Sequence, residues 1–205
     1  MGLADQYDSG GDELYYGSGN VGTDNPQTFT FDFDTGSSDT FIPGPACGQA
    51  QGCTGSTKYS QGGVDAGNTT SVTYGSGSVA GENFFDDVTI AGLTAKGQSI
   101  VSLTTASGFS GSASDSLMGM GFQSIAQSGQ PPFFQTLVNQ GQVANPEFAF
   151  YLGRAASGTQ DYSELTLGGR DSSKYTGEVT TMPVTTQGYG KGILDPRARP
   201  ILPRC

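Results

Sequence analysis

The feature that most constrains the fold is a series of short runs in which β-branched and aromatic residues alternate with polar ones. Successive side chains of an extended strand face opposite sides, so such runs predict strands with one buried face. The runs are Gln27–Phe33, Thr70–Tyr74, Asp87–Leu103, Glu147–Gly153, Ser163–Gly169 and Glu178–Val184. Glycine, serine, asparagine and aspartate separate them. The sequence therefore predicts an all-β fold, a sandwich or a barrel-like stack of antiparallel sheets.

One segment has a helical pattern instead. In Pro131–Gly141, "PPFFQTLVNQG", two prolines open the first turn, and Phe134, Leu137 and Val138 recur at helical spacing. Gly141 can end the helix. We expect the apolar face of this helix to pack on the core, and we expect one or two short helices in the whole chain.

Length and charge narrow the classes of function. The chain has 205 residues, which suits one domain or one half of a two-lobed protein. Nineteen acidic residues against nine basic ones give a net charge of -10. This charge opposes binding to a phosphate backbone, so we expect no nucleic-acid partner. No apolar run approaches the roughly 18 residues that a membrane helix needs, so we expect no membrane partner.

Histidine and cysteine usage restricts the chemistry further. The chain has no histidine, which excludes Ser/His/Asp and Cys/His centres and any histidine-ligated metal. Cys47 and Cys53 lie in a glycine-rich loop without companion metal ligands, which favours a local disulfide. A disulfide indicates an oxidising compartment and a secreted protein. The sequon at Asn68 is a candidate glycosylation site that fits secretion. We expect no metal and no cofactor.

The run "TFTFDFDTGSS" places two carboxylates two residues apart. By alternation, its phenylalanines line one face of a strand, and Asp32 and Asp34 line the other. Asp34 lies where the strand gives way to a turn, and there Gly36 permits close backbone approach and small hydroxyls can donate hydrogen bonds. Such donors keep a carboxylate ionised in acid, as a general base requires. Local chemistry therefore favours Asp34 over Asp32, although the tripeptide alone is better explained by a simple Asx-turn at a strand end.

Three local patterns point to other chemistry, and their contexts weigh against each. The glycine patterns at Gly17–Gly22 and Gly75–Ala80 are similar to a dinucleotide fingerprint, but neither opens a helix. The Asp-x-Asp pair resembles the nucleophile motif of haloacid dehalogenase-type phosphatases, which need alternating helices and strands. A calcium loop starting at Asp32 would place Gly36 at a ligand position and Pro43 at the closing glutamate position.

A wider resemblance overturns the simple-turn interpretation. "FDTGSSDTFIPG", Phe33–Gly44, resembles the first active-site motif of the pepsin-like aspartic proteases. Other motifs of that family's N-terminal lobe follow in order. "VTYGSGSVAG" at Val72–Gly81 is similar to the flap hairpin, and "SDSLMGMGF" at Ser114–Phe122 is similar to a buried strand motif. Residues 165–189 resemble the segment that leads out of the lobe. The resemblance is strongest to secreted fungal members.

The resemblance implies a domain plan and a set of residue roles. Residues 12–189 would form the lobe, after an N-terminal extension at 1–11 and before an atypical, basic, proline-rich tail at 190–205 that we expect to be disordered. Asp34 would be a catalytic aspartate. The residues implied to support it are Thr35, Gly36 and Ser37, with the Ser37 hydroxyl as a hydrogen-bond donor.

The same resemblance implies a binding cleft. Tyr74 would be the flap tyrosine that closes over the substrate, Gly75 and Ser76 would offer backbone and hydroxyl groups to a peptide, and Leu117 would line an apolar subsite. Asp115 would be structural, and Cys47 and Cys53 match the family's small loop disulfide. The implied activity is that of an aspartic-type endopeptidase acting on extended peptides or proteins at acid pH, without a cofactor.

Two departures from the family pattern matter. Phe41 stands where the family usually has tryptophan, so the ring there has no N–H to offer Tyr74. A second catalytic aspartate with an apolar run before it is absent, because the only other tripeptide match, at Asp8–Gly10, does not follow a buried strand. Such enzymes use two carboxylates around one water.

Three hypotheses follow from the single aspartate. The chain is one half of a secreted endopeptidase whose C-terminal lobe is missing, or two copies pair as retroviral proteases do and each supplies Asp34. In the third, the lobe is a non-catalytic peptide-binding or inhibitory module that retains the cleft.

Overall fold

The computed structural model describes residues 1–8, 11–75, 77–109, 111–153 and 163–181. Ser76 and the predicted tail at 190–205 lie outside these residues. The strands are β1 (Gly2–Asp8), β2 (Gly11–Val21), β3 (Gln27–Asp34), β4 (Thr40–Pro43), β5 (Val64–Thr73), β6 (Ser78–Ile90), β7 (Leu93–Ser107), β8 (Ser116–Gly119), β9 (Phe148–Tyr151) and β10 (Ser163–Leu167). One α-helix, α1 (Phe133–Asn139), and short 3-10 turns at Gln49–Gln51, Gln123–Ile125 and Ser172–Lys174 complete the described elements. The all-β prediction is confirmed.

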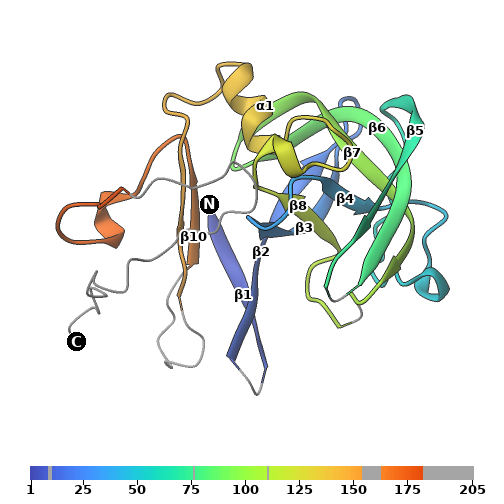
Figure 1. Ribbon diagram of the computed structural model, residues 1–205, viewed down its shortest axis with the longest axis horizontal. Coiled ribbons are helices and arrows are strands. Elements are labelled where there is room, and N and C mark those ends of the chain that lie inside the picture. The colour runs from blue at the N-terminus through green and yellow to red at the C-terminus, as the bar shows by residue number, and fades with distance from the viewer. Residues whose placement is uncertain (9–10, 76, 110, 154–162, 182–205) are drawn as a thin grey trace.

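The strands form one large sheet that closes on itself. Its order is β5-β6-β7-β4-β8-β3-β2-β1-β10-β9, and β2 also pairs with β6. That extra pairing, Asn20 with Thr89 and Val21 with Val88, turns the six strands from β6 to β2 into a barrel. Figure 1 shows the barrel on one side and the β1 and β10 strands extending away from it on the other. Residues 2–8, placed in an extension by the sequence, are part of this sheet.

The core follows the alternation that the sequence predicts for β3. Phe29, Phe31 and Phe33 are buried, and Asp32 and Asp34, each directly after a phenylalanine, lie on the other, partly exposed face. Burial of aromatic side chains on one face holds β3 in register, because a one-residue slip would move all three rings to the other face. The same register directs both carboxylates away from the core.

The run predicted as one strand at Asp87–Leu103 is two strands, so that prediction is wrong in its connectivity. β6 ends at Ile90 and β7 begins at Leu93, and Ala91 and Gly92 form the turn with φ of 53° and 80°. Two central residues with positive φ are what a tight hairpin turn requires, because that twist matches the strands. Because the turn has only two residues, the alternating patterns of β6 and β7 look like one continuous run in the sequence.

Two other predicted elements differ in extent from those in the structure. The α1 helix lies inside the predicted segment 131–141, with Phe133, Phe134 and Leu137 buried, so its apolar face is a core face as predicted. The predicted strand at Glu178–Val184 is wrong for residues 178–181, which form no strand, and its last residues lie outside the described part. In the described residues, no helix is long and apolar enough to span a membrane.

Candidate active site

Asp34 is the last residue of β3, at the point where the strand becomes a turn. The backbone N–H of Gly36 donates to its Oδ1 at 2.7 Å, and its own carbonyl accepts from the N–H of Met120 at 2.7 Å. Thr35 and Gly36 are exposed, so the turn is open to a ligand. The carboxylate is therefore oriented by a backbone donor on one side and accessible on the other.

The turn after Asp34 is held against the end of β8. Asp34 is level with Gly119 in the parallel pairing of β3 with β8. The N–H of Gly119 donates to Asp39 O at 3.0 Å, and that of Gly121 donates to Ser37 O at 2.8 Å. A Cβ on Gly119 would lie 2.4 Å from backbone atoms of Ser38, so only glycine allows this approach. These crossing contacts fix the position of Asp34.

Asp39 supports the turn from inside, a role that sequence reasoning missed. Its carboxylate is buried and accepts hydrogen bonds from Gln127 N at 2.7 Å, from Ser128 N at 3.1 Å and from the Ser128 hydroxyl. Three donors compensate a buried carboxylate for lost water. The sequence did contain a signal for this role, because an acid within the mostly apolar run after "TGSS" needs hydrogen-bond partners somewhere in the fold.

A hairpin of β5 and β6 forms the predicted flap. Thr73 pairs with Ser78, and the N–H of Tyr74 donates to Gly77 O at 2.7 Å across the tip. The flap is tied to β7 directly beside its tip, where the N–H of Ser78 donates to the Ser107 hydroxyl at 3.1 Å. The hairpin therefore carries Tyr74 on a short tip whose base is anchored.

The Tyr74 ring lies between two phenylalanines. Its centroid is 6.3 Å from that of Phe41 and 6.0 Å from that of Phe109, and both contacts are edge-to-face. Such aromatic pairs stabilise by about 1 kcal/mol each beyond burial. Phe41, where the family usually has tryptophan, therefore holds Tyr74 through ring packing. Phe109 is a second contact that sequence reasoning missed.

Two hydroxyls under the flap lack hydrogen-bond partners. The Tyr74 hydroxyl faces Ser37, but in the described part of the chain neither Tyr74 Oη nor Ser37 Oγ has a partner at hydrogen-bonding geometry. Burial raises the pKa of Tyr74 and the Ser37 hydroxyl partly opposes this rise, so the Tyr74 hydroxyl stays protonated and can donate. The donor that reaches the Asp34 carboxylate here is Gly36 N, where the sequence suggested Ser37. Unpaired buried hydroxyls are available to a water or a peptide group.

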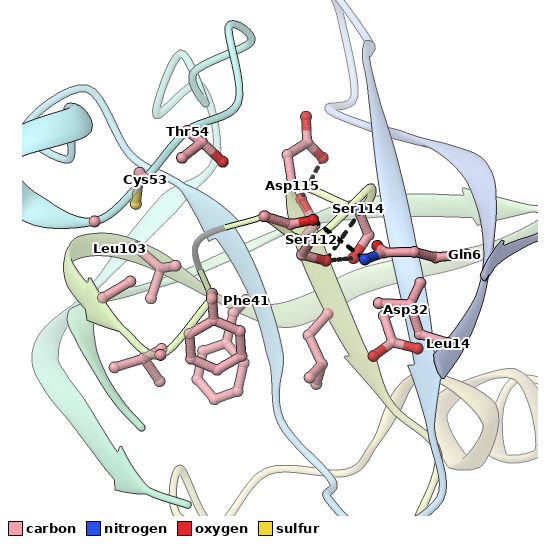
Figure 2. Close-up of a pocket in the computed structure, with 18 residues that line it drawn as sticks. Gln6, Leu14, Asp32, Phe41, Cys53, Thr54, Leu103, Ser112, Ser114 and Asp115 are labelled. Atoms are coloured by element: carbon pink, nitrogen blue, oxygen red, sulfur yellow. Dashed lines mark hydrogen bonds between the residues drawn. The ribbon is translucent and has the colours of Figure 1, made fainter. Parts of the chain in front are cut away.

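Two cavities adjoin these residues. The larger, of about 440 Å³, has Leu117 in its wall, together with Phe41, Phe109 and Leu103. Figure 2 shows Asp32 and Leu14 on the side of this cavity away from Phe41 and Leu103. The smaller cavity, of about 320 Å³, is lined by the flap and the Asp34 turn. The Asp34 turn and the flap tip therefore border the smaller cavity, and the Phe41 and Phe109 rings that contact Tyr74 border the larger one.

Two other acids, Asp32 of β3 and Asp115 just before β8, differ in their surroundings. Burial, and next the charge of Asp34, raises the pKa of Asp32 from its ordinary 3.8 to about 6. Asp115 is held by β3 instead, because its Oδ1 accepts from Thr30 N at 3.0 Å and from Thr30 Oγ1 at 2.9 Å. These hydrogen bonds from Thr30 fit the structural role expected of Asp115.

The remaining sequence-predicted residues fall near the rim. Cys47 and Cys53 form the predicted disulfide, and Cys53 lines the larger cavity. Gly75 lies exposed at the flap tip with open space around it. Asn68 is exposed on β5, where its Oδ1 accepts from Asn83 Nδ2 at 2.8 Å. Among the described residues, no group of three or more acidic or cysteine side chains could hold a metal ion.

Comparison with known proteins identifies the family. The family model described as eukaryotic aspartyl protease matches residues 14–195. The chain is 39% identical over 186 residues to the aspartic protease of Phaffia rhodozyma, a match that covers 89% of this chain and 44% of that protein. It is 35% identical over 191 residues to cathepsin D of Dictyostelium discoideum, covering 90% and 49%. It is 36% identical over 190 residues to mouse cathepsin E, covering 90% and 47%.

These relatives are about twice as long as the matched region, so the chain spans less than half the length of each. The match includes the Asp34 turn, the flap and the β8 strand in one continuous region. The chain therefore belongs to the eukaryotic aspartyl protease family and corresponds to the N-terminal part of these pepsin-like enzymes.

Proposed function

We propose that this chain supplies one half of the active site of an aspartic-type endopeptidase. The observation that carries the proposal is the Asp34 turn itself. A backbone donor orients the carboxylate, crossing bonds to β8 fix it, and a flap with Tyr74 borders the space beside it. An Asx-turn with a purely structural role would need neither the flap nor the cavity that adjoins this turn.

The chemistry requires a second carboxylate. Two aspartates share one proton around a water: one removes a proton as the water attacks the carbonyl, and the other donates a proton to the carbonyl oxygen. Asp34 is one member of this pair. Because the chain spans less than half of its relatives, a C-terminal lobe on the other side of the cleft is the source we propose for the second member.

The substrate would be a peptide or protein in an extended conformation. The flap tip offers backbone groups to such a chain, and the two unpaired hydroxyls of Ser37 and Tyr74 can hydrogen-bond to peptide groups. The cavity that contains Leu117 would hold a substrate side chain. The Cys47–Cys53 disulfide supports an oxidising, extracellular compartment, where Asn68 would be accessible to glycosylation.

The test is peptidase activity between pH 3 and pH 5 on a denatured protein substrate, over a range of chain concentrations. It is paired with the binding of an uncleavable extended peptide. The proposal expects peptide binding with little cleavage, and it expects Asp34→Asn to change the pH dependence of binding. Activity that rises with the square of concentration and is lost in Asp34→Asn would identify a homodimer as the source of both carboxylates. Absence of peptide binding at every pH would refute the half-site.

A further inference from the structure

The larger cavity, which contains Leu117, has an apolar wall and an acidic wall. Phe41, Leu103 and Phe109 form part of the apolar side. The charged residues that line it are Asp32 and Asp115, and among its described lining residues there is no lysine or arginine. An apolar subsite for an aliphatic or aromatic side chain has no need of these carboxylates.

Asp32 differs from Asp115 in its contacts. Asp115 uses Oδ1 to accept from Thr30 and from the Ser116 hydroxyl at 3.1 Å. In the described part of the chain, no hydrogen bond or ion pair reaches the Asp32 carboxylate, although the residue is partly buried. A partly buried carboxylate without a donor is stabilised by any cation that can reach it.

The position of Asp32 relative to the apolar wall indicates which kind of cation fits the cavity. Asp32 lies opposite Leu117 in the pairing of β3 with β8, and Leu117 lies opposite Phe41 in the pairing of β4 with β8. The carboxylate therefore lies one strand away from the apolar wall of the same cavity (Figure 2). A long side chain with an apolar stem and a charged end can satisfy both surfaces at once.

We propose that this cavity selects a basic side chain of the peptide, lysine or arginine, whose stem packs on Leu117 and Phe109 and whose cation pairs with Asp32. Asp32 is then a specificity-determining residue, and the substrate class is an extended peptide with a basic residue at one position of the cleft. The proposal rests on the proposed half-site, since it needs the peptide to lie in this cleft.

The selection depends on pH in a defined direction. The groups that face Asp32 are Asp34 on its own strand, Tyr16 opposite it on β2 and Asp115 just before β8, with Lys58 beside Asp115. None of these is a cation in contact with Asp32. The Asp32 carboxyl, whose pKa is about 6, is neutral in acid and charged at neutral pH. A lysine side chain is therefore preferred at pH 7 and loses its advantage at pH 4, so the selection acts on peptide binding near neutral pH and not in the acid range where cleavage is proposed.

The experiment measures binding of fluorescein-labelled, uncleavable octapeptides by fluorescence anisotropy. Lysine or norleucine, which has the same stem without the ammonium, occupies each position in turn. At one position, lysine is expected to bind about tenfold more tightly than norleucine at pH 7, the size of one charge-assisted pair. The ratio is expected to fall close to one at pH 4.

Two variants separate the local effect from the overall negative charge of the chain. Asp32→Asn is expected to abolish the lysine preference at that position. Asp24→Asn removes the same charge from an exposed turn outside the cavity and is expected to preserve the preference. Peptides that bind with no lysine preference, or a preference that survives Asp32→Asn, would overturn this inference and leave the half-site intact. Binding of neither peptide series would overturn the half-site and the inference together.

Discussion

Replacing Gly119 with alanine tests whether the close crossing of β8 and the Asp34 turn holds the site together. The added Cβ would lie 2.4 to 2.5 Å from the backbone N, Cα and C of Ser38. Non-bonded carbon atoms prefer about 3.5 to 4 Å, so the two segments must separate by roughly 1 Å. Backbone atoms on both sides leave no flexible side chain to give way.

The cost follows from what that separation breaks. Three backbone hydrogen bonds cross the contact: Gly119 N to Asp39 O at 3.0 Å, Met120 N to Asp34 O at 2.7 Å and Gly121 N to Ser37 O at 2.8 Å. Each contributes about 1 kcal/mol, and overpacking alone costs about 1 to 3 kcal/mol. We expect Gly119→Ala to lower the free energy of unfolding by roughly 4 to 6 kcal/mol, a large part of a typical domain's stability.

The assay is urea unfolding at pH 5 followed by far-ultraviolet circular dichroism. Gly169→Ala is the matched control, because nothing lies within 4 Å of a Cβ at that position and its φ is not positive. The control is expected to change the free energy of unfolding by less than about 0.5 kcal/mol. A loss below about 1 kcal/mol in Gly119→Ala would show that the crossing is not tightly packed, and the account of how Asp34 is positioned would be wrong.

Three further predictions concern stability. Asp32→Asn will raise the free energy of unfolding at pH 7 and leave it unchanged at pH 3. Folding raises the pKa of the Asp32 carboxyl from 3.8 to about 6, so the wild-type protein loses stability as the pH rises from 3.8 to 6. An equal gain at both pH values in urea unfolding would contradict this. Tyr59→Phe will cost about 2 kcal/mol in the same assay, because the buried carboxylate of Asp86 loses a 2.7 Å donor, and exposed Tyr175→Phe serves as a near-neutral control. Reducing the Cys47–Cys53 disulfide, which closes a loop with a sequence separation of 6, will cost about 2 kcal/mol in thermal unfolding, and an unchanged melting temperature would refute this.

Elements governed by local periodicity were predictable from the sequence. The alternation of Phe29, Phe31 and Phe33 with Asp32 and Asp34 determines which side chains of β3 are buried, because a strand has a period of two. The α1 helix follows from its apolar spacing and its proline start. Where local signals were ambiguous, prediction failed, as at Ala91–Gly92, where a two-residue turn leaves the alternation on both sides uninterrupted.

The candidate site likewise contains a local contact that the sequence can predict and distant contacts that it cannot. The tripeptide beginning at Asp34 lies at a strand end, and its carboxylate accepts from the backbone two residues later, which is a local interaction. The partners of Asp39 are close to ninety residues away, and Phe109 reaches Tyr74 only through the β6–β7 hairpin. No local pattern specifies such contacts, because they depend on which strands become neighbours.

The sequence by itself determined the strand content, the buried face of β3, the loop disulfide and the acid that ends the strand, since each follows from residue type and spacing within a few positions. Only the tertiary structure decided the barrel closure by β2 and β6, the position of Tyr74 between two rings, and the approach of Gly119 to Ser38. Those features rest on packing between distant segments, where shape and volume decide what fits. For the same reason, only the tertiary structure showed that Asp32 is partly buried beside a cavity, where no hydrogen bond or ion pair from the described residues reaches its carboxylate.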